Sequence, residues 1–158
     1  MKRLSTTSPL LDSVLGDEGS GAVLGKLLVG DVLKNQLPPA IKEAFLKHFD
    51  LTAPEIIDRV YRQPFPNRFL ASLSPFLAQH LEEPAIRSLV LNSFIAFLRR
   101  NVMQYDYKQY PVHFIGSVAH CYKEVLQEAA QTTGIQIGKI LQSPMEGLIQ
   151  YHQQVILL

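Results

Sequence analysis

The sequence predicts a helix-rich α/β fold, in which a helical block is followed by a small α/β unit. Up to about residue 103, apolar residues recur at the three- and four-residue spacing of helices, and prolines separate the runs. From residue 110 onward, two short β-rich runs alternate with two helical runs. Strands that alternate with helices in this way imply a parallel pair joined by a right-handed crossover.

Composition narrows the class of protein. The chain has 158 residues, of which 47% are hydrophobic and 18% charged, so it is long enough and apolar enough for one globular domain. Its net charge of +1 and its scattered basic residues give no electrostatic argument for binding nucleic acid or an anionic membrane. There is no apolar run long enough for a membrane span, no signal peptide is recognised at the start, and Cys121 is the single cysteine. We therefore expect a cytoplasmic protein.

The first helix is expected at about residues 19–36, after an irregular lead-in at residues 1–15. Its apolar residues follow a helical period, and Pro38-Pro39 ends it. Gly21 and Gly25 lie four residues apart, so one face of the helix is bare. Another backbone or a ligand can therefore approach that face closely.

Prolines and capping residues divide the rest of the helical block. Thr52 is an N-cap candidate, and Glu55 three residues later completes a capping box. The linker at residues 63–67 contains two prolines and should not be helical, and Pro75 should kink or split the helix that follows. The remaining helices are expected at 39–49, from Thr52 onward, at 67–81 and at 84–103.

The α/β unit is expected to contain two strands, at residues 110–115 and 135–141. A helix at 118–132 joins them and ends at Gly134, and Ser143-Pro144 begins a last helix. Two strands do not make a stable sheet alone, so residues 1–15, further chain or a partner should extend it. Because bare strand edges invite pairing, we also expect a homodimer.

Three glycines surround two carboxylates and a hydroxyl in the stretch Gly16-Asp17-Glu18-Gly19-Ser20-Gly21. Carboxylates and a serine at the start of a helix are good hydrogen-bonding groups for a polyol. The alternative interpretation is a simple helix N-cap, with acidic residues that complement the helix dipole. Spacing alone leaves both interpretations open.

A second candidate site lies in the α/β unit. Gly116 and Ser117 follow the first strand directly, and ligands bind at the carboxyl edge of parallel strands in open α/β sheets. The turn from Ser143 to Gly147 follows the second strand, and the two turns together favour a purine-nucleotide cleft. A tight strand-to-helix turn with no ligand is the alternative, since the common phosphate-binding fingerprints are absent.

The histidines and tyrosines do not predict a further site. The five histidines and one cysteine show no metal-ligand spacing, so no metal site is expected. The tyrosines at 105–110 have rings that can stack on a base, but amphipathic packing at the surface is the preferred interpretation.

Four motifs, read in order, resemble a known family. Together they resemble the carboxyl-terminal half of the BadF/BadG/BcrA/BcrD-type ATPases, in the N-acetylglucosamine-kinase-like branch, and the resemblance covers nearly everything from Val14 onward. The motifs are Leu15-Gly16-Asp17-Glu18-Gly19-Ser20-Gly21-Ala22, Phe65-Pro66-Asn67-Arg68-Phe69-Leu70-Ala71, Val112-His113-Phe114-Ile115-Gly116-Ser117-Val118-Ala119 and Ser143-Pro144-Met145-Glu146-Gly147-Leu148-Ile149.

The resemblance implies the actin/hexokinase/Hsp70-type ATPase fold, which is ribonuclease H-like and closes two domains on ATP and Mg²⁺. Residues 16–158 would be part of the carboxyl-terminal domain of a bacterial sugar kinase, with 16–103 as its helical block and 110–158 as its nucleotide-edge unit. The family transfers the γ-phosphoryl group of ATP to a hydroxyl of a sugar, here an amino sugar.

By the same resemblance, Asp17 corresponds to the aspartate that binds sugar hydroxyls, and Gly16, Glu18 and Ser20 lie in the same loop. Gly116 and Ser117 fall in the adenosine motif, and Ser143 and Gly147 lie beside it.

The sequence also departs from the family pattern. Its 158 residues contain neither the Asp-x-Gly-x-Thr phosphate hairpin nor the family's catalytic aspartate, so no catalytic residue is assigned. We expect a kinase portion that is inactive alone. The alternatives are a non-enzymatic helical interaction domain and one subunit of a split ATPase.

Overall fold

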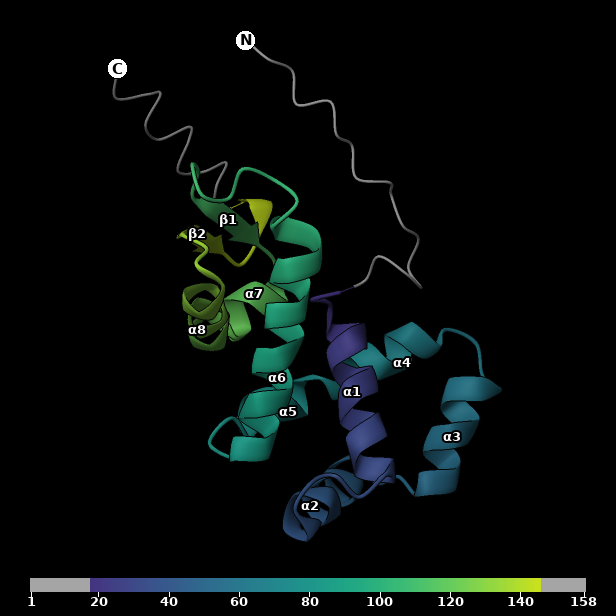
Figure 1. Ribbon diagram of the computed structural model, residues 1–158. Helices are drawn as coiled ribbons and strands as arrows, with labels where there is room; N and C mark the ends of the chain where they lie inside the picture. The colour runs from purple at the N-terminus through teal and green to yellow at the C-terminus, as the bar shows by residue number, and fades with distance from the viewer. Residues whose placement is uncertain (1–17, 146–158) are drawn as a thin grey trace.

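The computed structural model describes residues 18–145, and every structural statement below refers to these residues. Helix α6 runs through the middle of the molecule, with α1 and α4 on one side of it and β1, β2, α7 and α8 on the other (Figure 1). The elements are α1 (Gly21–Leu33), α2 (Pro39–Phe49), α3 (Ala53–Tyr61), α4 (Pro66–Leu73), α5 (Pro75–Gln79), α6 (Pro84–Phe97), the π-helical turn η1 (Leu98–Val102), β1 (Val112–Ile115), α7 (Ser117–Cys121), α8 (Lys123–Thr133) and β2 (Ile137–Leu141).

We call α1 to η1 the helical block, and β1, α7, α8 and β2 the βα unit. One hydrophobic core runs through both. From the helical block it takes residues such as Leu28, Phe45 and Phe94, and from the βα unit it takes Val125 and Leu126. The predicted order of a helical block and then an α/β unit is therefore confirmed. No helix of the described residues is long and apolar enough to cross a membrane.

The capping signals of the helical block are confirmed. The backbone N–H of Thr52 donates a hydrogen bond to Oε2 of Glu55 over 2.7 Å, at the start of α3. Hydrogen bonds from the side chain and the backbone of Thr52 lower the pKa of Glu55. At the start of α1, Oγ of Ser20 accepts a hydrogen bond from the backbone N–H of Val23 over 3.2 Å.

The bare face of α1 packs on a neighbouring backbone. Gly21 faces Ala71 and Ser74, and a Cβ added to Gly25 would overlap the carbonyl group of Leu70. Helices α1 and α4 thus approach each other more closely than side chains would allow. The sequence left open whether a backbone or a ligand approaches this face, and in the structure it is the backbone of α4.

The helix boundaries differ from the prediction in three places, one of which involves a proline. Pro75 splits the predicted 67–81 helix into α4 and α5, as expected, but α4 already begins at Pro66, inside the supposed linker. A proline is favourable in the first turn of a helix because its missing N–H needs no partner there. The predicted 84–103 helix changes from α-helix to π-helix after Phe97. The first helix is shorter than predicted and spans only Gly21–Leu33.

The single helix predicted at 118–132 is wrong, because Tyr122 interrupts it and separates α7 from α8. The ring of Tyr122 is buried, and its hydroxyl donates a hydrogen bond of 2.7 Å to the carbonyl oxygen of Ser74, at the break between α4 and α5. Burial raises the pKa of the Tyr122 hydroxyl. The helix break thus places a buried polar group where it finds its partner in the helical block.

Strands β1 and β2 pair in parallel, as predicted, and they form a two-stranded sheet within the described residues. Ile115 pairs with Leu141 at the carboxyl end, and the register shifts between Val112 and Phe114. The ring of His113 lies over Gly138, and its Nδ1 accepts a hydrogen bond from the backbone N–H of Lys139 over 2.9 Å. Pro144 and Met145 are helical, as the last predicted helix requires, and the rest of that helix lies outside the described residues, as does the lead-in at 1–15.

Candidate functional site

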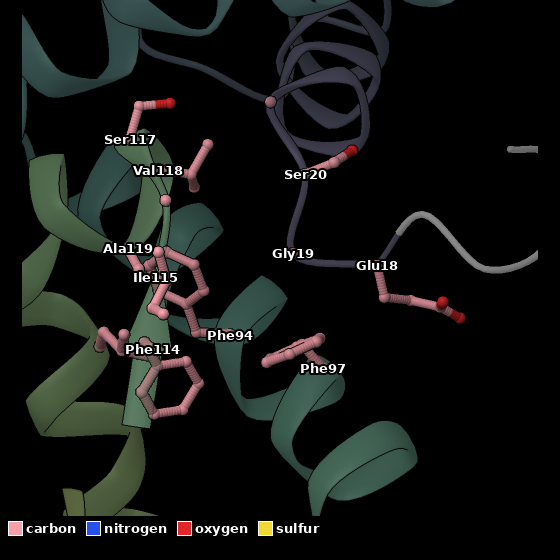
Figure 2. A pocket seen from close by; sticks show the side chains of 13 residues that line it. Glu18, Gly19, Ser20, Phe94, Phe97, Phe114, Ile115, Ser117, Val118 and Ala119 are labelled. Atoms are coloured by element: carbon pink, nitrogen blue, oxygen red, sulfur yellow. The ribbon is translucent and has the colours of Figure 1, made fainter. Parts of the chain in front are cut away.

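A pocket of about 370 Å³ lies between the glycine-rich loop before α1 and the turn after β1. Figure 2 shows Glu18 and Ser20 on one side of it and Ser117 and Val118 on the other, with three phenylalanine rings nearby. The structure therefore brings together two stretches that the sequence analysis selected separately. The pocket is lined by Glu18, Gly19, Ser20, Gly21, Phe94, Phe97, Phe114, Ile115, Gly116, Ser117, Val118, Ala119 and Leu126.

The loop wall combines a cap with a half-buried carboxylate. Ser20 caps α1, so the capping interpretation holds for this residue, although its hydroxyl can still donate a hydrogen bond to a ligand. The carboxylate of Glu18 lies 3.6 Å from Nη1 of Arg100 on η1. In Figure 2 that carboxylate points away from the turn after β1. Gly16 and Asp17, the other two predicted sugar-binding residues, lie outside the described residues.

The turn wall depends on Gly116. This residue has φ +144° and ψ 158°, a conformation that is essentially restricted to glycine. Its N–H donates to the carbonyl oxygen of Leu141 over 2.9 Å, which ties the turn to the end of β2. No atom lies within 4 Å of the place where a Cβ would stand, so the backbone there is open to a ligand. Ser117 follows and is exposed.

Ser143 lies at the same edge of the sheet, two residues after Leu141, which pairs with Ile115. It is half-buried and is not among the residues that line the pocket. Gly147 lies outside the described residues. Ser143 thus lies at the same sheet edge as the turn after β1, and of the described residues predicted on the nucleotide side Gly116 and Ser117 line the pocket.

The pocket is lined by a few hydrogen-bonding side chains and by apolar side chains, among them the phenylalanines. The lining includes one carboxylate, two hydroxyls and three phenylalanine rings, and no lysine, arginine or histidine is among the lining residues. Such a surface suits the hydroxyl groups and apolar faces of a polyol, whereas phosphates require cationic or N–H groups. The described residues contain no group of three His, Cys, Asp or Glu side chains that could hold a metal ion.

An aromatic groove beside the pocket was missed by the sequence analysis, which assigned its tyrosines to surface packing. This groove has a volume of about 620 Å³, lies between η1 and β1, and shares Phe97, Phe114 and Ile115 with the pocket. Tyr105 and Tyr110 line it and are 46% and 65% exposed. The clustering of tyrosines just before a strand was the available signal.

Comparison with known proteins finds similar solved structures. No protein-family model and no curated protein matches the chain. Among solved structures, it is similar to a protein from Porphyromonas gingivalis described as "Putative N-acetylglucosamine Kinase", with 59% sequence identity and a TM-score of 0.84. The match covers 89% of this chain and 50% of that chain.

The chain therefore spans about half the length of the protein that it matches. The helix-rich α/β fold is that of part of a protein described as a sugar kinase.

Proposed function

We propose that this chain is the carboxyl-terminal portion of an ATP-dependent kinase for N-acetylglucosamine-like amino sugars, within the BadF/BadG/BcrA/BcrD-type ATPases and their actin/hexokinase-type fold. The observation that carries the proposal is the shared pocket. Two motifs about one hundred residues apart, one assigned to the sugar and one to the nucleotide, line the same cavity. The 59% identity to a protein described as a sugar kinase supports the same conclusion.

On the sugar side, Glu18 and Ser20 provide hydrogen-bonding groups at the pocket, and Gly16 and Asp17 immediately precede them. Asp17 is the residue that we propose as the main acceptor for sugar hydroxyls. The phenylalanine rings of the floor offer an apolar surface for the C–H face of a sugar ring. Glu18 is held near Arg100, which keeps a negative charge at the edge of the pocket without a large desolvation cost.

On the nucleotide side, Gly116 and Ser117 are proposed to contact the adenosine part of ATP, with Ser143 and Gly147 beside them. The open space at Gly116 supports this assignment, because a ligand can reach the backbone there. Mg²⁺ in such sites is usually held by substrate phosphates with one or two carboxylates, so it would enter with ATP. The described residues offer no dedicated metal site, and no catalytic step through the metal is derived.

The lining of the pocket also supports the proposal that the chain is inactive alone. Phosphoryl transfer depends on positioning and on neutralising the charge of the transferred group. No cationic side chain lines the pocket, so nothing on the described wall would neutralise the γ-phosphoryl group. We therefore propose that this chain holds the sugar and the adenosine side, and that transfer requires groups from elsewhere.

Isothermal titration calorimetry of the 158-residue chain with N-acetylglucosamine and with ATP–Mg²⁺ tests this function. We expect weak binding of the sugar, reduced about tenfold or more by Asp17→Asn and less by Glu18→Gln, because each loses a charged hydrogen-bond acceptor. Glu43→Gln on α2, an exposed glutamate outside the pocket, is the matched control.

The outcomes separate the alternatives. If neither N-acetylglucosamine nor ATP–Mg²⁺ gives a heat of binding, the result would favour a non-enzymatic helical interaction domain. Sugar phosphorylation by the chain alone, abolished by Asp17→Ala, would contradict the proposed inactivity. A homodimer stays a prediction, and light scattering after size-exclusion chromatography measures it.

A further inference from the structure

The junction between α6 and η1 lies against the loop that precedes α1. The helix changes there from α- to π-geometry after Phe97, and the N–H of Met103 donates to the carbonyl oxygen of Leu98, five residues back, over 2.9 Å. Single π-turns in helices are rare and are frequently found at functional sites. Two side chains of this junction, Phe97 and Arg100, reach the loop before α1.

The ring of Phe97 packs on the backbone of the loop at Gly19 (Figure 2). A Cβ added to Gly19 would lie 3.1 Å from Cδ2 and 3.2 Å from Cγ of this ring, which is closer than an ordinary van der Waals contact. Gly19 also has φ +80°, in the left-handed region that other residues rarely adopt. The path of the loop is therefore set by the ring as well as by the backbone of Gly19.

The same ring contacts the opposite wall of the pocket. Its centroid lies 6.4 Å from that of Phe114 on β1, at an interplanar angle of 59°, which is a favourable tilted arrangement of two aromatic rings. Phe114 stands two residues before Gly116, in the strand that leads into the turn after β1. Phe97 is half-buried and lines both the pocket and the aromatic groove. One side chain thus touches the loop assigned to the sugar and the strand that carries the turn assigned to the nucleotide.

Arg100 reaches the same loop one residue earlier. Its Nη1 lies 3.6 Å from Oε1 of Glu18, whose side chain is 25% exposed, and Figure 2 shows that carboxylate turned away from the turn after β1. The side chain of Arg100 is 71% exposed, so the ion pair contributes little to the stability of the fold. Its effect is on the direction of the Glu18 side chain, and Glu18 follows Asp17 directly in the chain.

We propose that Phe97 is a positioning residue of the pocket, which fixes the loop before α1 at Gly19 and the strand before the nucleotide-side turn at Phe114, with Arg100 as a second anchor of the loop. The inference rests on the proposed function, because this loop carries Asp17, the proposed acceptor for sugar hydroxyls. A loop that is already ordered binds its ligand more tightly, since its ordering is not left to the moment of binding. None of these contacts requires a ligand, so the role can be measured in the chain alone.

Amide hydrogen exchange of the ¹⁵N-labelled chain tests both contacts without a ligand. The N–H of Val23 bonds to Oγ of Ser20 and reports on the loop, and the N–H of Gly116 bonds to Leu141 and reports on the turn. We expect Phe97→Leu to speed exchange at both amides about tenfold, because leucine lacks the ring that reaches both walls. Phe97→Tyr keeps the ring and should restore slow exchange. Unchanged exchange at both amides in Phe97→Leu would overturn the proposal, and a change at Val23 alone would overturn the link to β1.

Phe69→Leu on α4 is the matched control for the loss of a ring. Phe69 is also a half-buried phenylalanine packed against the core, but it does not line the pocket. Its replacement should leave exchange at Val23 and Gly116 unchanged. Equal acceleration by Phe69→Leu and Phe97→Leu would show a general loosening of the fold and would overturn the positioning role.

Gly19→Ala approaches the contact from the loop and covers the case in which Phe97→Leu does not fold. The added methyl group meets the ring of Phe97, so exchange should become faster at Val23 and, through the displaced ring, at Gly116 on the other wall. Gly30→Ala, whose methyl group meets no atom within 4 Å, should change neither amide. Unchanged exchange at Gly116 in a folded Gly19→Ala chain would overturn the link between the two walls.

Titration calorimetry with N-acetylglucosamine separates this inference from the proposed function. We expect Phe97→Leu to weaken sugar binding about tenfold and Phe97→Tyr less than about twofold, because only the first loses the ring that orders the loop. Unchanged sugar affinity in Phe97→Leu would overturn the positioning role. If the wild-type chain binds no sugar while the exchange results hold, the assignment to a sugar kinase is contradicted and the positioning of the loop stands.

The second anchor is tested in the same titration. Arg100→Gln should weaken sugar binding about threefold, in keeping with an exposed ion pair, and high salt should weaken wild-type binding in the same direction. Arg99→Gln, at the neighbouring exposed arginine, is the matched control and should have no effect. Equal losses with the two variants would show a general charge effect and would overturn the role of Arg100.

Discussion

The helical block and the βα unit differ in how they satisfy their own backbone. Each helix forms its hydrogen bonds internally, so the helical block needs neighbours only to bury side chains, and residues such as Leu28 and Phe45 are fully buried there. The two strands of the βα unit leave one side of β1 without a described partner. The helical block therefore satisfies its backbone hydrogen bonds locally, whereas the outer side of β1 has no paired strand among the described residues.

The two regions also differ in how they use glycine. In the helical block, Gly25 allows a close approach between α1 and α4. In the βα unit, Gly116 provides a backbone conformation that other residues rarely adopt, with open space beside it. Glycine thus serves packing in one region and access to the pocket in the other.

The largest expected effect is in the packing of α1. Gly25→Ala should lower the free energy of unfolding by about 3 kcal/mol, because the added methyl group overlaps the backbone of Leu70, which cannot rotate away. Gly30→Ala in the same helix meets no atom within 4 Å and should raise the free energy of unfolding by about 0.5–1 kcal/mol. Urea unfolding followed by circular dichroism compares the two. Equal effects would show that α1 and α4 are not in close contact.

A smaller effect is expected at the junction between the two regions. Tyr122→Phe removes the donor to the Ser74 carbonyl and should cost about 1–3 kcal/mol, because a buried acceptor loses its partner. Burial raises the pKa of Tyr122 above the ordinary value of about 10, so the folded protein holds this proton more tightly than the unfolded chain. Its contribution to stability is present below about pH 10 and is lost as the pH rises further.

Urea unfolding at pH 8, 10 and 11 checks whether the stability contributed by Tyr122 is lost as the pH rises. The wild-type chain should lose more stability across this range than Tyr122→Phe. An identical pH dependence in the two proteins would mean that the Tyr122 hydroxyl is not buried.

The smallest effect is expected in the sheet. Gly138→Ala should push the ring of His113 aside and break its hydrogen bond with the N–H of Lys139, at a cost of about 1 kcal/mol. The effect is small because His113 is exposed and its side chain can turn toward solvent. Amide exchange at Lys139 should become about fivefold faster. An unchanged rate would show that the His113 ring does not bind this amide.

The candidate site could be predicted in part. The residues of the two walls, Glu18 and Ser20 on one side and Gly116 and Ser117 on the other, were identifiable because glycine-rich stretches before helices are visible locally. Their common pocket was not, because it depends on how α6 and its phenylalanines hold α1 beside β1. The aromatic groove was missed because it depends on how η1 and the loop that follows it pack beside β1.

The sequence by itself determined the elements that depend on neighbouring residues. The capping box at Thr52 and Glu55, the split at Pro75 and the left-handed Gly134 after α8 all arise from local sterics and local hydrogen bonds. Only the tertiary structure decided the break at Tyr122, whose partner is 48 residues away in the chain. It also decided whether the bare face of α1 meets a backbone or a ligand. Burial and long-range contacts set these outcomes, and neither is contained in the local pattern of residues.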